Sequence, residues 1–150
     1  GPDGALLPHD QVIRNLIDEA VLADEVGLDA IGIGEHHRDD FAVSAPDMVL
    51  AGIATRTTRL KVATAVTVLS SDDPVRVFER FSTLDALSNG RAELIAGRGS
   101  FIESFPLFGY DLSDYEALFE GKLELMAQLI HGGRQSWTGT LTQPAPRARL

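Results

Sequence analysis

Apolar side chains in residues 10–26 recur at the spacing of one face of an α-helix. They occupy positions 12, 13, 16, 17, 20, 21 and 26. A single buried stripe therefore runs along the segment. Asp10 can cap the start of this helix, and Gly27 stands where helices often end in a left-handed residue. The pattern predicts an amphipathic helix with one face against a core.

Three short apolar segments are typical of buried strands. They lie at 28–34, 60–69 and 91–96 and are rich in alanine, valine, isoleucine and glycine. Near-continuous apolar strands of this kind are characteristic of parallel sheets that are covered by helices.

Three more helices are predicted, at 45–56, 74–88 and 114–130, each between or after the strands. Their boundaries rest on local signals: Ser44 with Asp47 and Ser113 with Glu116 as capping boxes, Asp72 and Asp73 before Pro74, and Asn89-Gly90 and Gly132-Gly133 as stops. Residues 134–150 hold prolines and glycine among polar and basic residues and are expected to be an irregular tail.

The regular alternation of helices and strands predicts one α/β domain over residues 1–150. Two architectures fit, an open doubly wound sheet and a (β/α)8 TIM barrel. Three strands are too few to close a barrel, and the first helix follows GPDG, which resembles the loop after a missing strand. The chain is therefore interpreted as an interior part of a larger barrel.

Composition and charge exclude several classes of function. The 150 residues include no cysteine, which excludes disulfides, zinc thiolate sites and a cysteine nucleophile. A net charge of −9 argues against nucleic acid as a partner. There is no apolar run of about 18 residues and no export signal, so a cytoplasmic protein without a membrane span is expected.

The segment after the first strand, GEHHRDDF at 34–41, offers the clearest acid–base candidate. Side chains alternate along a strand, so His36 follows the face of Gly32 and Gly34 and points into the mouth of the sheet, whereas Glu35 and His37 point away. The diverging histidines would form a poor chelate, so no metal site is predicted. His36 is the candidate for acid–base work, with plain surface histidines as the alternative.

Two further segments follow strands at the same end of the sheet. Around Ala65 and Val66 there is no acid or base, only backbone that could face an aromatic ligand or form a plain core strand. Gly97, Arg98 and Gly99 would let backbone approach a ligand closely beside one cation. Four of the chain's ten aromatic residues follow within 101–110 and suit either a hydrophobic ligand or a small satellite core.

These segments resemble one family in their order. The sequences GLDAIGIGEHH, TAVTVLSSDDPVRVFERFSTLDALSNGRAELIAGRGS and FPLFGYDL resemble the first half of bacterial luciferase-like flavin-dependent monooxygenases. The resemblance covers about residues 10–131. It implies a (β/α)8 barrel that uses reduced FMN, or in some branches a deazaflavin, together with oxygen to oxidise a small organic substrate.

The resemblance also assigns roles to individual residues. It places His36 beside the flavin in acid–base steps, a non-proline cis peptide at Ala65–Val66 under the flavin ring, and Arg98 near the flavin phosphate. Gly97 stands where the luciferases have a reactive cysteine, so light emission is not expected.

Partners follow from the same resemblance. It implies a homodimer that pairs through the helices at 45–56 and 74–88, and it allows a separate flavin reductase as a second partner. The family keeps further flavin-phosphate contacts beyond residue 150, so this chain is expected to carry about half of a site. A flavin-binding or assembly module without turnover is the alternative function.

Overall fold

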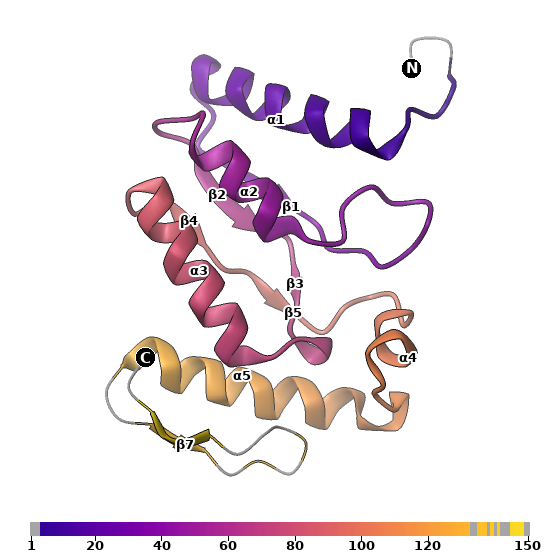
Figure 1. The fold of residues 1–150 in the computed structure, drawn as a ribbon, viewed down its shortest axis with the longest axis vertical. Coiled ribbons are helices and arrows are strands. Elements are labelled where there is room, and N and C mark those ends of the chain that lie inside the picture. The colour runs from indigo at the N-terminus through magenta and orange to yellow at the C-terminus, as the bar shows by residue number, and fades with distance from the viewer. Residues whose placement is uncertain (1–3, 133–134, 138, 140, 142–144, 149–150) are drawn as a thin grey trace.

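The structure is a computed structural model that describes residues 4–132, 135–137, 139, 141 and 145–148. Helices and short strands alternate along most of its length (Figure 1). The α-helices are α1 (His9–Val26), α2 (Pro46–Ala54), α3 (Pro74–Ser88), α4 (Ser104–Phe108) and α5 (Tyr115–His131). The strands are β1 (Ala30–Ile33), β2 (Lys61–Thr64), β3 (Thr67–Val68), β4 (Ala92–Glu93), β5 (Ala96–Gly97), β6 (Gln135–Trp137) and β7 (Ala145–Ala148), and 3-10 turns η1 (Leu69–Ser71) and η2 (Leu112–Asp114) complete the list.

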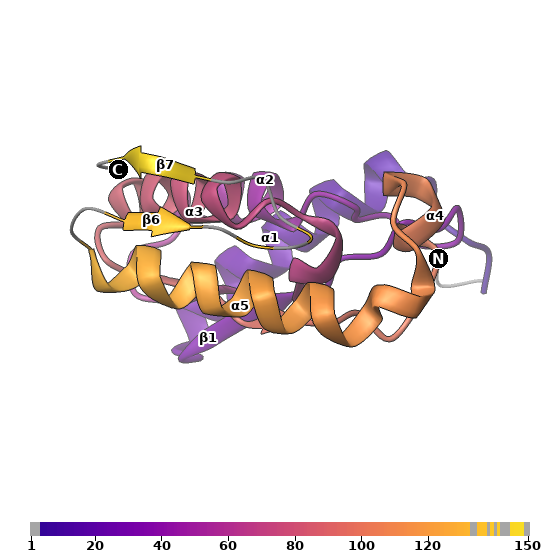
Figure 2. The same cartoon turned by 90° about the horizontal axis from the view of Figure 1, so that it is seen from below.

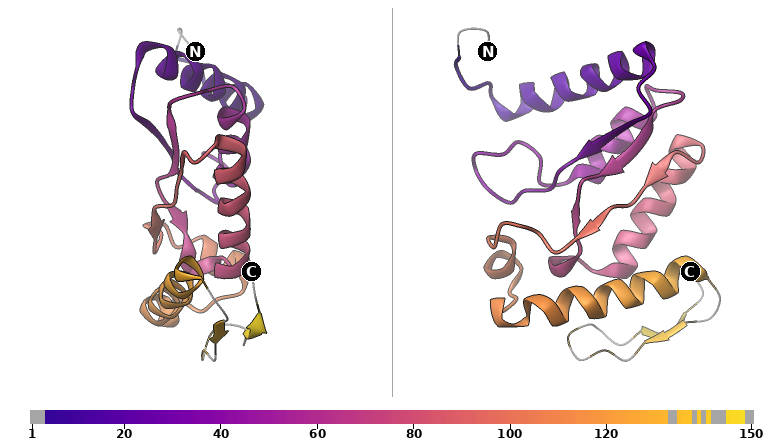
Figure 3. Two further views of the ribbon diagram at one scale, coloured as in Figure 1. Left: turned by 90° about the vertical axis from the view of Figure 1, so that its left-hand side faces the viewer. Right: turned by 180° about the vertical axis from the view of Figure 1, so that it is seen from behind.

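The central sheet is parallel, as the sequence predicted. Its strand order is β1-β2-β4, with Ile31 opposite Val62 and Val62 opposite Ala92. A second parallel pair, β3 and β5, continues β2 and β4 beyond a bend. Helices α2 and α3 cover one side of the sheet, while α1 and α5 flank it at opposite edges (Figure 3). This arrangement forms part of a (β/α)8 barrel and confirms the predicted fold class.

The core lies between the sheet and its helices. Leu50 and Ile53 of α2, Val62 of β2 and Val77 of α3 are fully buried there, and Met126 of α5 joins the same cluster. Figure 2 shows α5 running alongside α3, which brings α5 onto this core. Among the described residues, no helix combines the length and apolar character needed to cross a membrane.

Some predicted boundaries are confirmed and others are wrong. Asp73 caps α3 by accepting a hydrogen bond from Val75 N at 2.8 Å, and Gly27 and Asn89 end α1 and α3 in left-handed conformations. Asp10 does not cap α1, because that helix begins one residue earlier, after Pro8.

The two predicted capping boxes are absent. Asp47 forms an ion pair with Arg80 at 2.6 Å, so its carboxylate serves a tertiary contact instead of the start of α2. Helix α5 begins after Asp114 with no side-chain cap, and the N–H of Ser113 instead donates to Asp111, which caps η2, at 2.8 Å.

The tail after α5 differs from the irregular chain that the sequence predicted. Strands β6 and β7 pair antiparallel, with Trp137 opposite Ala145. Prolines suggested a loop, but proline is tolerated in a strand that pairs on one side only, and β7 contains Pro146 in such a position.

Candidate functional site

The carboxyl ends of the parallel strands surround a cleft of about 80 Å³. It brings together four of the six predicted site residues, His36, Ala65, Val66 and Gly99. Its remaining lining consists of Glu35, His37, Val68, Ser100, Phe101, Glu103 and Ser104. Neither Gly97 nor Arg98 lines it.

His36 is held in this cleft by aromatic rings. Its imidazole stacks on Phe41 with ring centroids 4.0 Å apart and meets the edge of Phe101 at 5.0 Å. Its backbone N–H donates to Val43 O at 3.1 Å, which fixes the loop after β1. The imidazole therefore has a defined position beside the bend at residues 65–66.

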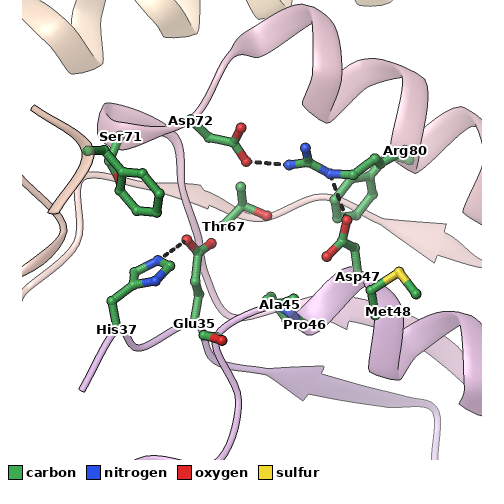
Figure 4. A pocket seen from close by; sticks show the side chains of 13 residues that line it. Glu35, His37, Ala45, Pro46, Asp47, Met48, Thr67, Ser71, Asp72 and Arg80 are labelled. Atoms are coloured by element: carbon green, nitrogen blue, oxygen red, sulfur yellow. Dashed lines mark hydrogen bonds and ion pairs between the residues drawn. The ribbon is translucent and has the colours of Figure 1, made fainter. Parts of the chain in front are cut away.

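His37 also lines the cleft, but its imidazole has different partners from that of His36. Its Nε2 lies 2.8 Å from Glu35 Oε1, and its ring meets the edge of Phe108 at 5.0 Å. The second oxygen of Glu35 accepts a hydrogen bond from Val68 N at 2.9 Å. The side chains of His37 and Glu35 are only 11% and 9% exposed. Figure 4 shows them side by side. No pattern in the sequence indicated the contact between Glu35 and Val68, because the two residues are 33 positions apart.

The peptide bond between Ala65 and Val66 is cis, the geometry that the family resemblance implied. It separates β2 from β3, so the predicted strand at 60–69 is interrupted. The N–H of Ala65 donates to Ile33 O at 2.7 Å, which ties the bend to the end of β1.

Two glycines beside this bend allow close packing of the chain. A Cβ on Gly32 would lie 2.9 Å from Ala65 Cβ, and a Cβ on Gly97 would lie 2.5 Å from Val66 Cγ2. The space next to these glycines is therefore filled by side chains of the bend. Gly97 lets β5 approach Val66, whereas the sequence interpretation assigned it to close contact with a ligand.

Arg98 likewise lies away from the cleft. Its guanidinium pairs with Glu116 of α5 at 3.2 Å and lies over the Phe119 ring at 5.2 Å. The side chain is 44% exposed, so this arginine is held by α5 yet open to solvent.

The aromatic residues of the loop after β5 divide between the two predicted alternatives. Phe101 lines the cleft, while Phe105 is fully buried and stacks on Tyr115 at 5.4 Å. The hydroxyl of Tyr115 donates to Gly99 O at 2.8 Å, which anchors the loop to α5. The loop is thus both a wall of the cleft and a small core.

A cation and a carboxylate stand at the rim of the cleft. Arg38 donates two hydrogen bonds of 2.8 Å to Asp40 and lies 5.0 Å above the Phe101 ring. The hydrogen bond from Arg38 lowers the pKa of the Asp40 carboxyl. The rim therefore carries a charge-balanced pair.

A larger cavity of about 420 Å³ lies behind Glu35 and His37 (Figure 4). Arg80 spans it and pairs with both Asp47 and Asp72. Asp72 was expected only as a helix-capping residue, but its position before α3 lets it meet this arginine. Within the described residues, no group of three or more metal-ligating side chains gathers.

A buried lysine supports the turn after β3. Lys122 of α5 donates to Ser70 O at 2.7 Å and lies 4.1 Å from the centroid of the Tyr110 ring. Burial lowers the pKa of its ammonium group to about 8. The sequence did not single out this residue, because a lysine within a helix is usually solvated.

Comparison with known proteins agrees with this geometry. A protein of Sinorhizobium fredii named uncharacterized protein y4wF is 33% identical over 138 residues, which cover 91% of this chain and 40% of the relative. The alkanal monooxygenase alpha chain of the Kryptophanaron alfredi symbiont is 30% identical over 128 residues, covering 84% of this chain and 36% of the relative. The chain thus spans about two fifths of the length of these relatives.

A solved structure shows the same fold. The oxygenating constituent of 3,6-diketocamphane monooxygenase from Pseudomonas putida, in complex with FMN, superposes with a TM-score of 0.86 at 21% identity. The match covers 95% of this chain and 40% of that one. A family model of luciferase-like monooxygenases matches residues 2–150, and the chain therefore belongs to the luciferase-like monooxygenase family.

Proposed function

We propose that this chain forms part of the active site of a flavin-dependent monooxygenase that acts on a small organic substrate with oxygen. The observation that carries the proposal is the meeting of His36 with the Ala65–Val66 bend in one cleft. FMN is the favoured cofactor, with a deazaflavin as the variant used in some branches of the family. The FMN complex of the structural neighbour supports this choice.

The residues of the cleft suit one edge of a flat ring. Ala65 and Val66 supply an apolar wall that carries no acid or base, and a Cβ on Gly34 would lie 3.5 Å from both Ala65 O and His36 Nε2. The glycine thus leaves room between the imidazole and the bend. A cleft of about 80 Å³ is smaller than typical cofactor pockets of about 300–1,000 Å³. We therefore expect these residues to contact only part of the flavin.

His36 is the proposed acid–base group. When bound, reduced flavin supplies the electrons for activating oxygen. His36 would take up and return a proton at the edge of the cleft, a task that suits an imidazole near neutral pH. Arg98, which is exposed beyond its pair with Glu116, would need to turn from α5 to reach a flavin phosphate.

Flavin binding and oxygen transfer test the proposal in the protein that carries this chain. We expect FMN to bind with a change in its visible absorbance, and a small organic substrate such as an aldehyde to gain one oxygen atom from O2 when reduced flavin is supplied; oxygen consumption by itself is not diagnostic, because free reduced flavin reacts with oxygen without an enzyme. Oxygen transfer with NAD(P)H alone would show that no separate flavin reductase is needed. Flavin binding without oxygen transfer to substrate under either condition would favour a non-catalytic flavin-binding module and overturn the monooxygenase.

We also propose a homodimer that pairs through α2 and α3. Met48 of α2 and Leu87 of α3 are 71% and 50% exposed, so each of the two helices presents a large apolar side chain that such a pairing would cover. Light scattering at micromolar concentration should show twice the monomer mass, and a monomer alone would contradict this pairing.

A further inference from the structure

Glu35 is a buried carboxylate for which the proposed chemistry provides no role. Its side chain is only 9% exposed, yet no lysine or arginine among the described residues forms an ion pair with it. Both of its oxygens are nevertheless occupied, one by His37 Nε2 at 2.8 Å and the other by Val68 N at 2.9 Å. A buried carboxylate held in this way has a fixed position.

The two contacts connect the two halves of the cleft. Glu35 precedes His36 in the chain, so fixing its side chain limits the backbone that carries the imidazole. Val68 lies two residues after Val66, in the strand that continues from the bend. Glu35 therefore links the segment that carries the acid–base candidate directly to the strand that follows the wall of the cleft.

The bend is tied to β1 at two points. On its near side, Ala65 N donates to Ile33 O at 2.7 Å, a backbone contact within the sheet. On its far side, Glu35 alone among the described side chains bonds the backbone N–H of Val68. Losing this carboxylate would free the far side from the loop after β1, although β3 would stay paired with β5, where Thr67 N donates to Ile95 O at 2.8 Å.

We propose that Glu35 is a positioning residue that holds Val66 and Val68 in register with His36. This inference rests on the proposed function, since it concerns the same cleft. The role requires a side chain long enough to place a hydrogen-bond acceptor at the N–H of Val68, and it does not require a negative charge. Glutamine would keep that acceptor and could donate its amide N–H to a neutral His37, whereas alanine removes both contacts.

The test combines three substitutions of Glu35 in the whole protein with two readouts. The first readout needs no flavin: hydrogen exchange of the peptide that contains Val68. We expect faster exchange in Glu35→Ala and protection close to wild type in Glu35→Gln, because only the glutamine can accept the Val68 N–H. Melting curves establish that each variant is folded at the assay temperature.

The second readout is flavin affinity and turnover. In Glu35→Ala we expect kcat to fall about 100-fold, the size of effect that a 1 Å displacement of reacting groups can produce, with recovery of most of this loss in Glu35→Gln. If Glu35→Ala does not fold, Glu35→Asp replaces it. Aspartate keeps the charge but is one methylene shorter, so the same loss of kcat is expected.

Glu93→Ala is the matched control. It breaks an exposed ion pair with Lys61 on the same sheet and should change neither hydrogen exchange nor kcat.

The outcomes separate the two claims. A wild-type protein that binds no flavin contradicts the proposed function, while the exchange result still reports on the Glu35 contact. A folded Glu35→Ala with wild-type exchange, affinity and kcat overturns the positioning role. Glu35→Gln that is as impaired as Glu35→Ala, or Glu35→Asp that is unimpaired, would also overturn it, because charge would then matter instead of reach.

Discussion

The two ends of the parallel sheet differ in how completely their polar and charged side chains are paired. At the amino ends of the strands, Asp24 accepts hydrogen bonds from the backbone N–H groups of Thr58, Arg59 and Leu60 at 2.7–2.9 Å. Arg91 binds backbone carbonyls from three segments, among them Ala54 O at 2.8 Å and Ser88 O at 2.6 Å. The carboxylate of Asp24 and the guanidinium of Arg91 thus hold loops and helices together. Their hydrogen-bonding groups are used in these contacts.

At the carboxyl ends, the polar groups are less completely paired. His36 is packed by rings, and the hydroxyl of Ser104 in the cleft wall is buried without a hydrogen-bond partner among the described residues. In barrels of this kind the carboxyl end carries catalysis and the amino end carries stability. Substitutions at the two ends should therefore separate activity from folding.

The largest expected effect is on activity, at the carboxyl end. His36→Ala should lower turnover by about 100- to 10,000-fold, the usual contribution of an acid–base group. The dissociation constant of FMN should change by less than about tenfold, since ring and phosphate contacts dominate flavin binding. Steady-state kinetics and flavin titration measure the two quantities. His37→Ala should be milder; equal losses in both variants would contradict the assignment.

At the amino end, a substitution of Arg91 is expected to affect stability and to leave activity unchanged. Arg91→Leu should lower the free energy of unfolding by about 2–4 kcal/mol, because several buried carbonyl groups lose a charged donor. Urea denaturation measures this change. Activity per folded molecule should stay near wild type, and a specific loss of kcat would break the proposed separation between the two ends.

Gly97→Ala probes the packing beneath the bend. The added Cβ would lie 2.5 Å from Val66 Cγ2. Such overpacking should lower the free energy of unfolding by about 1–3 kcal/mol and also weaken flavin binding, as Val66 must move. Gly121→Ala in α5 is the control. Its Cβ would meet nothing within 4 Å, and it should stabilise the helix by about 0.5–1 kcal/mol. Unchanged flavin affinity in Gly97→Ala would exclude Val66 from the flavin contact.

The smallest effect concerns acid stability. Hydrogen bonds from backbone N–H groups, led by Thr58, lower the pKa of Asp24 from 3.8 to about 2. A lowered pKa means that this carboxylate stabilises the fold above pH 3.8 and loses its contribution as the pH falls toward 2. Asp24→Asn should therefore be less stable at neutral pH and show a shallower decline across this window. Denaturation at several pH values checks the slope; an unchanged slope would contradict the assignment.

The sequence by itself determined the order of the long helices and of the parallel strands between them. Period-two alternation predicted that Glu35 and His37 share a side, and the two side chains are hydrogen-bonded at 2.8 Å, although β1 ends at Ile33. Family motifs indicated the Ala65–Val66 bend. The same local rules failed for Ser44 and Ser113, whose predicted caps do not form.

Only the tertiary structure decided which charged groups meet. The contacts of Glu35 with Val68, Arg98 with Glu116, Arg80 with Asp47 and Asp24 with Leu60 join segments that lie 18 to 36 positions apart or in separate elements. Periodicity reports which face of an element is apolar, but it does not say which segment packs against that face. The partner of a long polar side chain depends on that packing, and so the roles of Glu35 and Arg98 became visible only in the folded chain.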